Sequence, residues 1–260
     1  MPDKVIARAA NKLYPSMAGD VPAIVNFDLT IAEGEFVCLV GPSGCGKSTF
    51  LRILAGLESL SGGEARIVPG PDPRRPLNNV VFQEYAIFPW KTVLENVAFG
   101  LEMRGVPRAE RLETASMWLA KVGLKRFASY YPAQISGGMK QRVSIARALA
   151  NDPEVLLMDE PLGALDAQTR AVLQEELLRL WEESHKTVLY VTHSIDEAVL
   201  LGDRVVLMTA HPGTNKSEFE VDLPRPRDLS TTSTARYAEL TGAIWNDLRD
   251  EVRAAMEAQR

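Results

Sequence analysis

The sequence predicts an α/β protein built around a mostly parallel β-sheet, and the first of three observations is the order of its segments. Short apolar segments with strand-forming residues alternate with segments of helical periodicity, as strands and crossover helices do in parallel sheets. The expected buried strands are Phe36–Val40, Val80–Phe82, Val155–Met158, Val188–Thr192 and Arg204–Met208.

The other two observations concern segments that depart from this alternation. Residues 24–35 and 64–68, with the Gly- and Pro-rich turn 69–76, predict a small antiparallel β portion near the front of the chain. Residues 92–150 contain no convincing strand, whereas their apolar residues recur at helical spacing. We therefore expect a helical subdomain, at about 92–150, inserted into the α/β domain.

Residues 213–260 differ in character from residues 1–212, which we expect to form the α/β domain with its insertion. Prolines at 212, 224 and 226 indicate a linker. An amphipathic C-terminal helix should follow, because apolar residues then recur on one helical face. These residues are Tyr237, Leu240, Ile244, Leu248 and Val252.

Composition describes an ordinary globular protein of 260 residues, with 46% apolar and 24% charged residues. The net charge of −5 gives no support to nucleic acid as a partner. Two cysteines cannot form a disulfide framework, and we expect reduced thiols. No apolar run approaches the length of a membrane span, and the N-terminus lacks a signal-peptide core. We expect a cytosolic protein, unless another subunit ties it to a membrane.

A glycine-rich segment follows the expected strand Phe36–Val40 and precedes a helix. It fits the pattern Gly41-x-x-x-x-Gly46-Lys47-Ser48 of a phosphate-binding P-loop. Glycines let the backbone aim several N–H groups at one anion, and the helix N-terminus adds partial positive charge. Lys47 would reach the β- and γ-phosphates, and Ser48 would ligate Mg²⁺. The predicted nucleotide-binding residues here are Gly41, Pro42, Ser43, Gly44, Cys45, Gly46, Lys47, Ser48 and Thr49.

Two carboxylates end the apolar strand Val155–Met158. Asp159 suits the Mg²⁺ shell, and Glu160 suits a general base for an attacking water. The alternative is a strand that simply ends in a charged turn. The P-loop makes the catalytic interpretation the better one.

A second anion-binding turn is the discriminating feature. Ser136-Gly137-Gly138 opens a helix, so its N–H groups and helix N-terminus can also hold a phosphate. One fold seldom needs two phosphate cradles. Here the sequence resembles the ATP-binding cassette (ABC) family, whose signature loop is normally LSGGQ. Ile135 and Met139 depart from that motif but leave its Ser-Gly-Gly core intact.

Further motifs of the family follow in order. Gln83 matches the Q-loop glutamine, which implies a catalytic and Mg²⁺-binding role, and His193 matches the catalytic switch histidine. Gly163-Ala164-Leu165-Asp166 resembles the D-loop, with Gly163 in place of the usual Ser and Asp166 near the nucleotide. Tyr14 is a weaker match to the aromatic residue that stacks on adenine, and a simple packing role stays open.

The resemblance implies a RecA-like P-loop NTPase that hydrolyses ATP with Mg²⁺. Two copies would sandwich two ATP molecules, with the P-loop of one facing Ser136–Gly138 of the other. The family also implies a separate membrane permease, at whose cytoplasmic face the chain would lie, and indirectly an extracytoplasmic solute-binding protein. We expect the permease to dock near Phe88, Pro89 and Trp90, although local packing of Phe88 and Trp90 is the alternative.

Within the family, segments 82–106 and 163–170 look most like the ATPase subunits of nitrate/sulfonate/taurine-type importers, so we expect a small, anionic solute. A non-transport ABC-type ATPase is the main alternative, but the chain has one P-loop, one signature loop and no heptad array. A GTPase or small kinase would leave the signature loop unexplained. A module that only senses ATP would not need Glu160.

Overall fold

The computed structural model describes residues 2–17 and 19–258. The chain divides into two compact units. The first consists of Met1–Pro69 and His185–Arg260, and the second of Gly70–Ser184. Each unit carries some of the residues that the sequence predicts to be functional.

An antiparallel sheet in the first unit has the strand order β2-β1-β4. Its strands are β1 (Asp3–Tyr14), β2 (Val21–Ala32) and β4 (Gly62–Ile67). Ala7 of β1 pairs with Leu29 of β2 and with Ala65 of β4. Strands β2 and β4 confirm the antiparallel portion expected from the sequence. Strand β1 was not predicted, because lysine, asparagine and alanine interrupt its apolar pattern.

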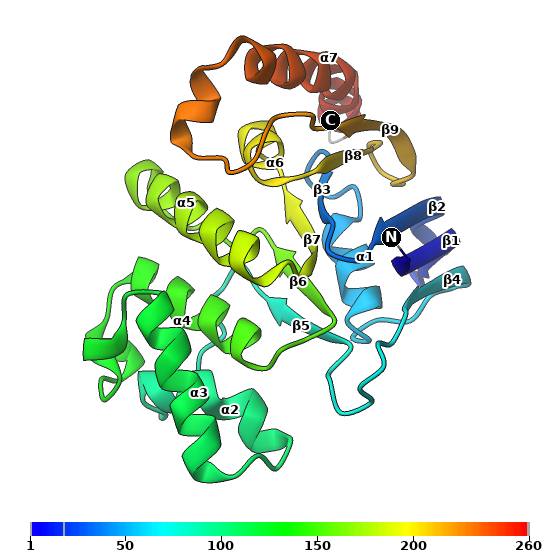
Figure 1. The fold of residues 1–260 in the computed structure, drawn as a ribbon. Helices are drawn as coiled ribbons and strands as arrows, with labels where there is room; N and C mark the ends of the chain where they lie inside the picture. The colour runs from blue at the N-terminus through cyan, green and yellow to red at the C-terminus, as the bar shows by residue number, and fades with distance from the viewer. Residues whose placement is uncertain (1, 18, 259–260) are drawn as a thin grey trace. The chain divides into compact units, whose positions relative to one another are not determined.

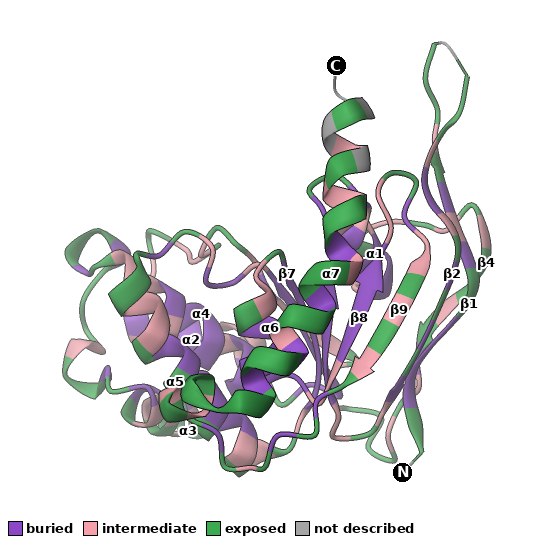
Figure 2. Cartoon of the chain, turned by 90° about the horizontal axis from the view of Figure 1, so that it is seen from above, coloured by how far each residue is buried: buried purple, intermediate pink, exposed green. Residues whose placement is uncertain are grey.

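Parallel strands form the core of the same unit. Strand β3 (Phe36–Val40) pairs in parallel with β7 (Thr187–Thr192) on one side and β8 (Arg204–Met208) on the other. Every residue of β3 and β7 is buried, which explains their continuous apolar character. Strand β9 (Asn215–Glu220) adds an antiparallel edge to β8, and Figure 2 shows the contrast between buried β8 and half-exposed β9.

The prediction of a linker after residue 212 did not include this strand. Strand β9 starts at Asn215 and pairs with β8 from Arg204 to Met208. Alternating charged residues give β9 little apolar signal, since one of its faces is exposed. The segment that follows is also fastened, because the buried guanidinium of Arg227 donates to the carbonyls of Gly202 (2.6 Å), Val221 (3.0 Å) and Leu223 (3.0 Å).

Helices complete the first unit. They are α1 (Lys47–Leu54), α6 (Ile195–Leu201), the short 3-10 helix η3 (Leu229–Ser233) and α7 (Ala235–Ala258). Helix α7 packs on α6, as Figure 1 shows. The predicted apolar face of α7 is real: Tyr237, Leu240, Ile244 and Leu248 are buried.

The second unit contains one parallel strand pair, β5 (Asn78–Val81) and β6 (Val155–Asp159), with Asn79 beside Leu156. Residues 92–150, predicted to form a helical subdomain, contain helices joined by short loops and no strand. Helix α2 begins with a capping box in which Thr92 and Glu95 exchange hydrogen bonds. The helices are α2 (Val93–Met103), α3 (Arg108–Lys121), η1 (Lys125–Phe127), η2 (Pro132–Gln134), α4 (Gly137–Ala150) and α5 (Ala167–Ser184).

The α/β class is thus confirmed, with parallel strand pairs and helical connections in both units. Within the described residues, none of the helices combines the length and the apolar character that crossing a membrane requires. Cys38 and Cys45 are buried, free thiols, as expected.

Candidate nucleotide-binding and hydrolysis site

The P-loop connects β3 to α1, and its backbone explains its glycines. Gly44 and Gly46 have φ angles of 81° and 102°, which side chains disfavour. A Cβ on Gly46 would also lie 2.8 Å from the Ala23 carbonyl oxygen of β2. The loop therefore needs glycine at 46 for its conformation and for packing. Gly46 is also the N-cap of α1, and the first N–H groups of a helix have no partner within the helix.

Lys47 is buried against the loop that it belongs to. Its Nζ donates hydrogen bonds to the carbonyl oxygens of Gly41 (2.8 Å) and Pro42 (2.9 Å). The Cys45 thiol lies 3.7 Å from the same ammonium, and burial raises the pKa of Cys45 although Lys47 opposes the shift. The charge of Lys47 is thus held at the loop, where an incoming phosphate would compete with carbonyl oxygens for it.

Ser48 and Thr49 are half-buried in the first turn of α1, directly after Lys47. Tyr14 lies at the end of β1, also half-buried, and Lys12 Nζ lies 4.8 Å from its ring centroid. Lys12 is itself paired with Glu58 at 3.0 Å. Tyr14 therefore has a cation against its ring, which limits the part of its surface that could stack on a base.

His193 is exposed at the turn between β7 and α6. The turn is fixed by Ser194, which caps α6 by accepting from Glu197 N (3.2 Å), and by the buried Glu197 carboxylate. That carboxylate accepts from Tyr190 (3.0 Å) and Thr192 (2.8 Å). The position of the imidazole is thus set by a hydrogen-bonded strand end.

The second unit places the predicted acids at the end of β6. Asp159 is buried, and Glu160 follows with a φ angle of 45°. A non-glycine residue in this region costs about 1–3 kcal/mol, and such strain concentrates at functional sites. This backbone conformation of Glu160 turns the chain directly after the buried strand and leaves the side chain half-exposed.

Gln83 and Glu160 come together at the D-loop. A Cβ placed on Gly163 would lie 3.5 Å from Gln83 Nε2 and 3.6 Å from Glu160 Oε2. These are ordinary contact distances, so the family's usual Ser would fit in place of Gly163. An amide N–H donor and a carboxylate acceptor that flank one loop position form a polar corner, which suits a water.

The signature turn is packed by residues that the sequence motifs did not single out. Ser136 caps α4 by accepting from Met139 N (3.3 Å). A Cβ on Gly137 would lie 2.7 Å from the Tyr85 hydroxyl, and one on Gly138 would lie 2.8 Å from Thr169 Cγ2. A side chain at either position would therefore have to displace Tyr85 or Thr169. No local spacing signals this role, since both residues are distant in sequence.

Asp166 joins the D-loop to the same cluster. Its carboxylate accepts from Thr169 N at 2.9 Å, and this hydrogen bond lowers the pKa of Asp166. An ionised, exposed Asp166 therefore caps the start of α5. The structure thus brings together Gln83, Glu160 and the D-loop, and links the D-loop through Thr169 to Gly138.

A strand–glycine loop–helix unit with a buried lysine defines the class: this is a P-loop nucleotide-binding protein. The particular family follows from comparison with known proteins. The family model described as "ABC transporter" matches residues 24–163, more than half of the chain. The chain therefore belongs to the ABC transporter family, and it is an ATP-hydrolysing subunit.

Three relatives illustrate the match. An uncharacterized ABC transporter ATP-binding protein of Methanocaldococcus jannaschii is 51% identical over 93% of this chain and 90% of its own length. The nitrate import ATP-binding protein NrtD of Synechocystis sp. is 46% identical over 86% of this chain and 85% of its own. The bicarbonate transport ATP-binding protein CmpD of the same organism is 48% identical over 84% and 79%.

Solved structures agree with the fold. A dimeric post-hydrolysis state of an ATP-binding cassette bound to ADP and Pi superposes with a TM-score of 0.72 at 37% identity. The match covers 84% of this chain and 98% of that one. The predicted P-loop NTPase fold is confirmed.

Proposed function

We propose that the chain is the ATPase subunit of an importer for a small anion, which works as a homodimer beneath a membrane permease. The observation that carries this proposal is the near full-length similarity to the nitrate and bicarbonate transport proteins. Nitrate is the first solute to test, followed by bicarbonate, sulfonates and taurine. The permease and an extracytoplasmic binding protein would select the cargo.

The proposed mechanism assigns one task to each predicted residue. Lys47 and the P-loop N–H groups hold the β- and γ-phosphates, and Ser136 with the signature N–H groups of a second copy completes the site. Glu160 accepts the proton of the attacking water, while His193 and Gln83 orient water and γ-phosphate. Tyr14 contacts the adenine, and Asp166 lies at the interface of the two copies.

The donor set also fits Mg²⁺. The hydroxyl of Ser48, the amide oxygen of Gln83 and the carboxylate of Asp159 are hard oxygen ligands of the kind that Mg²⁺ prefers. Such an ion would offset charge on the triphosphate. The polar corner made by Gln83 and Glu160 at Gly163 supports a place for the attacking water.

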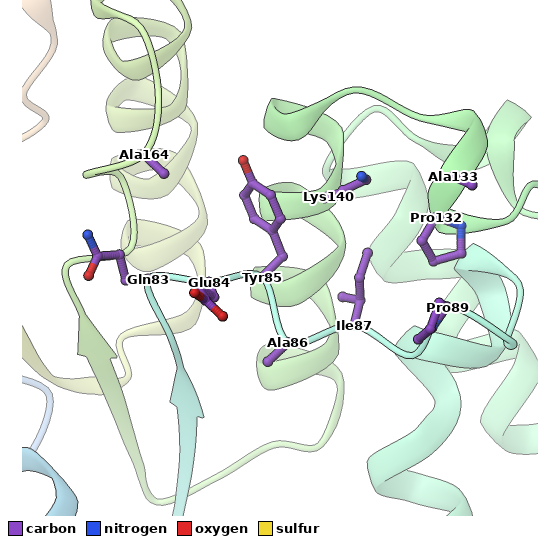
Figure 3. Close-up of a pocket in the computed structure, with 10 residues that line it drawn as sticks. All are labelled: Gln83, Glu84, Tyr85, Ala86, Ile87, Pro89, Pro132, Ala133, Lys140 and Ala164. Atoms are coloured by element: carbon purple, nitrogen blue, oxygen red, sulfur yellow. The ribbon is translucent and has the colours of Figure 1, made fainter.

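A groove in the second unit suits the permease. Its volume is about 780 Å³, and Figure 3 shows its two walls: the segment from Gln83 to Pro89, and a wall that includes Pro132, Ala133 and Lys140. Most of the lining is apolar, which suits a short helix of a membrane subunit. Tyr85 lines the groove and also touches Gly137, so an occupant would press on the residue that packs the signature turn.

The aromatic cluster beside the groove divides into two roles. Phe88 is half-buried, with its ring centroid 4.5 Å from that of Phe99, and its backbone is held by Asn96. Phe88 therefore follows the alternative of local packing that the sequence left open. Trp90 is 72% exposed and remains a candidate contact for the permease.

Uptake by whole cells tests the function. Cells that lack the gene should lose import of labelled nitrate, and the wild-type gene should restore it, whereas the Lys47→Ala gene should not. Bicarbonate and taurine are measured in parallel. Loss of one solute alone names the cargo, and normal import of all of them in the deleted strain would contradict the proposal.

A further inference from the structure

The C-terminal helix α7 is held in a defined place on the first unit. The Tyr237 hydroxyl lies 3.1 Å from Asp196 Oδ1 on α6, and Leu240, Ile244 and Leu248 are buried. Near its end, the Glu251 carboxylate accepts from Ala210 N (2.7 Å) and pairs with Lys216 at 2.6 Å. These contacts at both ends fix the helix rather than tether it loosely.

Its apolar face continues past the buried residues and reaches the phosphate-binding loop. A cavity of about 320 Å³ lies between α7 and the outer edge of the P-loop. The loop side consists of Gly41, Pro42 and Ser43, with His193 beside them. The helix side consists of Trp245, Leu248, Val252 and Ala255. An apolar helix wall therefore stands directly beside two elements that are proposed to hold and switch the γ-phosphate.

Trp245 is only half-buried by the fold. Its side chain is 49% exposed and also lines a second hollow of about 360 Å³, with Ile195 and Asp196 of α6 and Ala238, Thr241 and Gly242 of α7. About half of the indole surface is left exposed beside these two hollows, although burial is what normally makes tryptophan favourable. Such a side chain at the edge of a site is typical of an interface anchor.

The neighbouring elements indicate what covers this surface. In the proposed dimer, the P-loop and His193 face the signature turn of a second copy, and solved relatives are dimeric. The cavity and Trp245 are continuous with that face, because they share Gly41, Pro42, Ser43 and His193. A helix whose sole role was to cover the P-loop would pack tightly on it. Helix α7 instead leaves an apolar cavity between itself and the loop.

We propose that α7, through Trp245 and Val252, forms part of the surface on which a second copy of the chain closes when ATP binds. This inference rests on the proposed ATP-dependent homodimer and extends it: the C-terminal helix becomes an element of the composite site. Closure would cover the indole and exclude water beside the switch histidine.

The test measures dimer formation by the full chain in a Glu160→Gln background, in which slow hydrolysis should preserve the ATP-bound dimer. Multi-angle light scattering with and without Mg-ATP should give a dimer for this parent. Adding Trp245→Glu should leave a monomer at the same concentration, and Trp245→Ala should weaken dimerisation by at least about tenfold. Binding of a labelled ATP to the monomer and the melting temperature should both stay unchanged.

Met117→Glu is the matched control. Met117 is 48% exposed on α3, so the change places a charge on an equally exposed apolar side chain elsewhere, and dimerisation should persist. A dimer that forms normally with both Trp245 variants overturns the inference alone. Stronger dimerisation, or lost ATP binding by the monomer, also overturns it, because α7 would then obstruct or support the loop. A parent that binds ATP but never dimerises overturns the proposed homodimer as well.

Discussion

Two glycine-bearing turns in this chain each start a helix, yet their glycines are required for different reasons. At the P-loop, the backbone itself demands glycine: Gly44 and Gly46 have positive φ angles, and Gly46 touches the backbone of β2. At the signature turn, Gly137 and Gly138 lie inside α4 with helical backbone. There, a Cβ would meet the side chains of Tyr85 and Thr169, which would have to move to make room for it.

Two glycine motifs can therefore look alike in sequence although the backbone of the loop itself requires one, and contacts with residues distant in sequence shape the other. The P-loop is a self-contained cradle whose lysine already bonds to its own carbonyl oxygens. The signature turn is capped by Ser136 and shaped by a groove residue, Tyr85, and by the D-loop helix. ATP binding by a single copy should therefore depend on the P-loop. The signature turn should instead respond to a second copy or to an occupant of the groove.

The largest effect on ATP turnover is expected at Glu160, the proposed general base, which lies outside both turns. Glu160→Gln keeps the shape of the side chain but cannot accept a proton. We expect turnover to fall by roughly 10²–10⁴-fold with ATP affinity retained. A phosphate-release assay beside equilibrium ATP binding checks this. Near-wild-type turnover would remove Glu160 from the role of base.

Loss of the P-loop charge should affect binding by a single copy. Lys47→Ala removes a charged hydrogen-bond donor worth ~1.5–3 kcal/mol, so ATP should bind about tenfold more weakly or worse. Ser136→Asp is the contrast, because Asp preserves the helix cap but adds a negative charge. Monomer affinity should not change for this variant. ATP titrations measure both affinities. An equal loss of ATP affinity in the two variants would contradict the separate roles of the two turns.

Added methyl groups test why each glycine is needed. Gly46→Ala should lower the free energy of unfolding by about 1–3 kcal/mol, because strain and a backbone clash cannot relax. For Gly137→Ala, the obstructing atom is the end of the Tyr85 side chain. Tyr85→Phe should therefore recover most of the stability lost in Gly137→Ala. Urea unfolding of the single and double variants measures this recovery, and its absence would mean that the signature turn is also limited by its backbone.

The smallest effect on the isolated chain is expected at the aromatic surface beside the groove. Trp90→Ala should change stability by less than about 0.5 kcal/mol and leave basal ATPase intact, because the indole is exposed. Phe88→Ala should cost about 2 kcal/mol, since its ring packs on Phe99. Co-purification with the permease should weaken for Trp90→Ala. A large loss of stability for this variant would assign Trp90 to the core.

How far the sequence predicts this molecule depends on how local each feature is. Strands β3, β6 and β7 are buried along their whole length, and the P-loop is encoded in nine consecutive residues. Strands β1 and β9 were not predicted. Polar residues interrupt the apolar pattern of β1, and in β9 exposed charged residues alternate with half-buried residues. The amphipathic face of α7 was visible, but its approach to Gly41–Ser43 was not, since no spacing links residues 200 positions apart.

The same limit applies at the signature turn. Its Ser-Gly-Gly core was recognised from a family resemblance, whereas the reason for the glycines lies in Tyr85 and Thr169, which the fold brings close. The split of the aromatic cluster into an inward Phe88 and an outward Trp90 likewise depends on Phe99 and Asn96. Sequence shows which residues carry chemistry, and packing shows what holds them in place.

The central claim is that the P-loop of one copy works with the signature turn of another. Mixing two inactive variants tests it most directly: Lys47→Ala has a defective P-loop, and Ser136→Asp has a defective signature turn. Mixed dimers would contain one site with both elements intact, so the mixture should hydrolyse ATP well above the sum of the separate variants in a phosphate-release assay. If the two turns act within one copy, the mixture will be as inactive as its components, and that result would contradict the account.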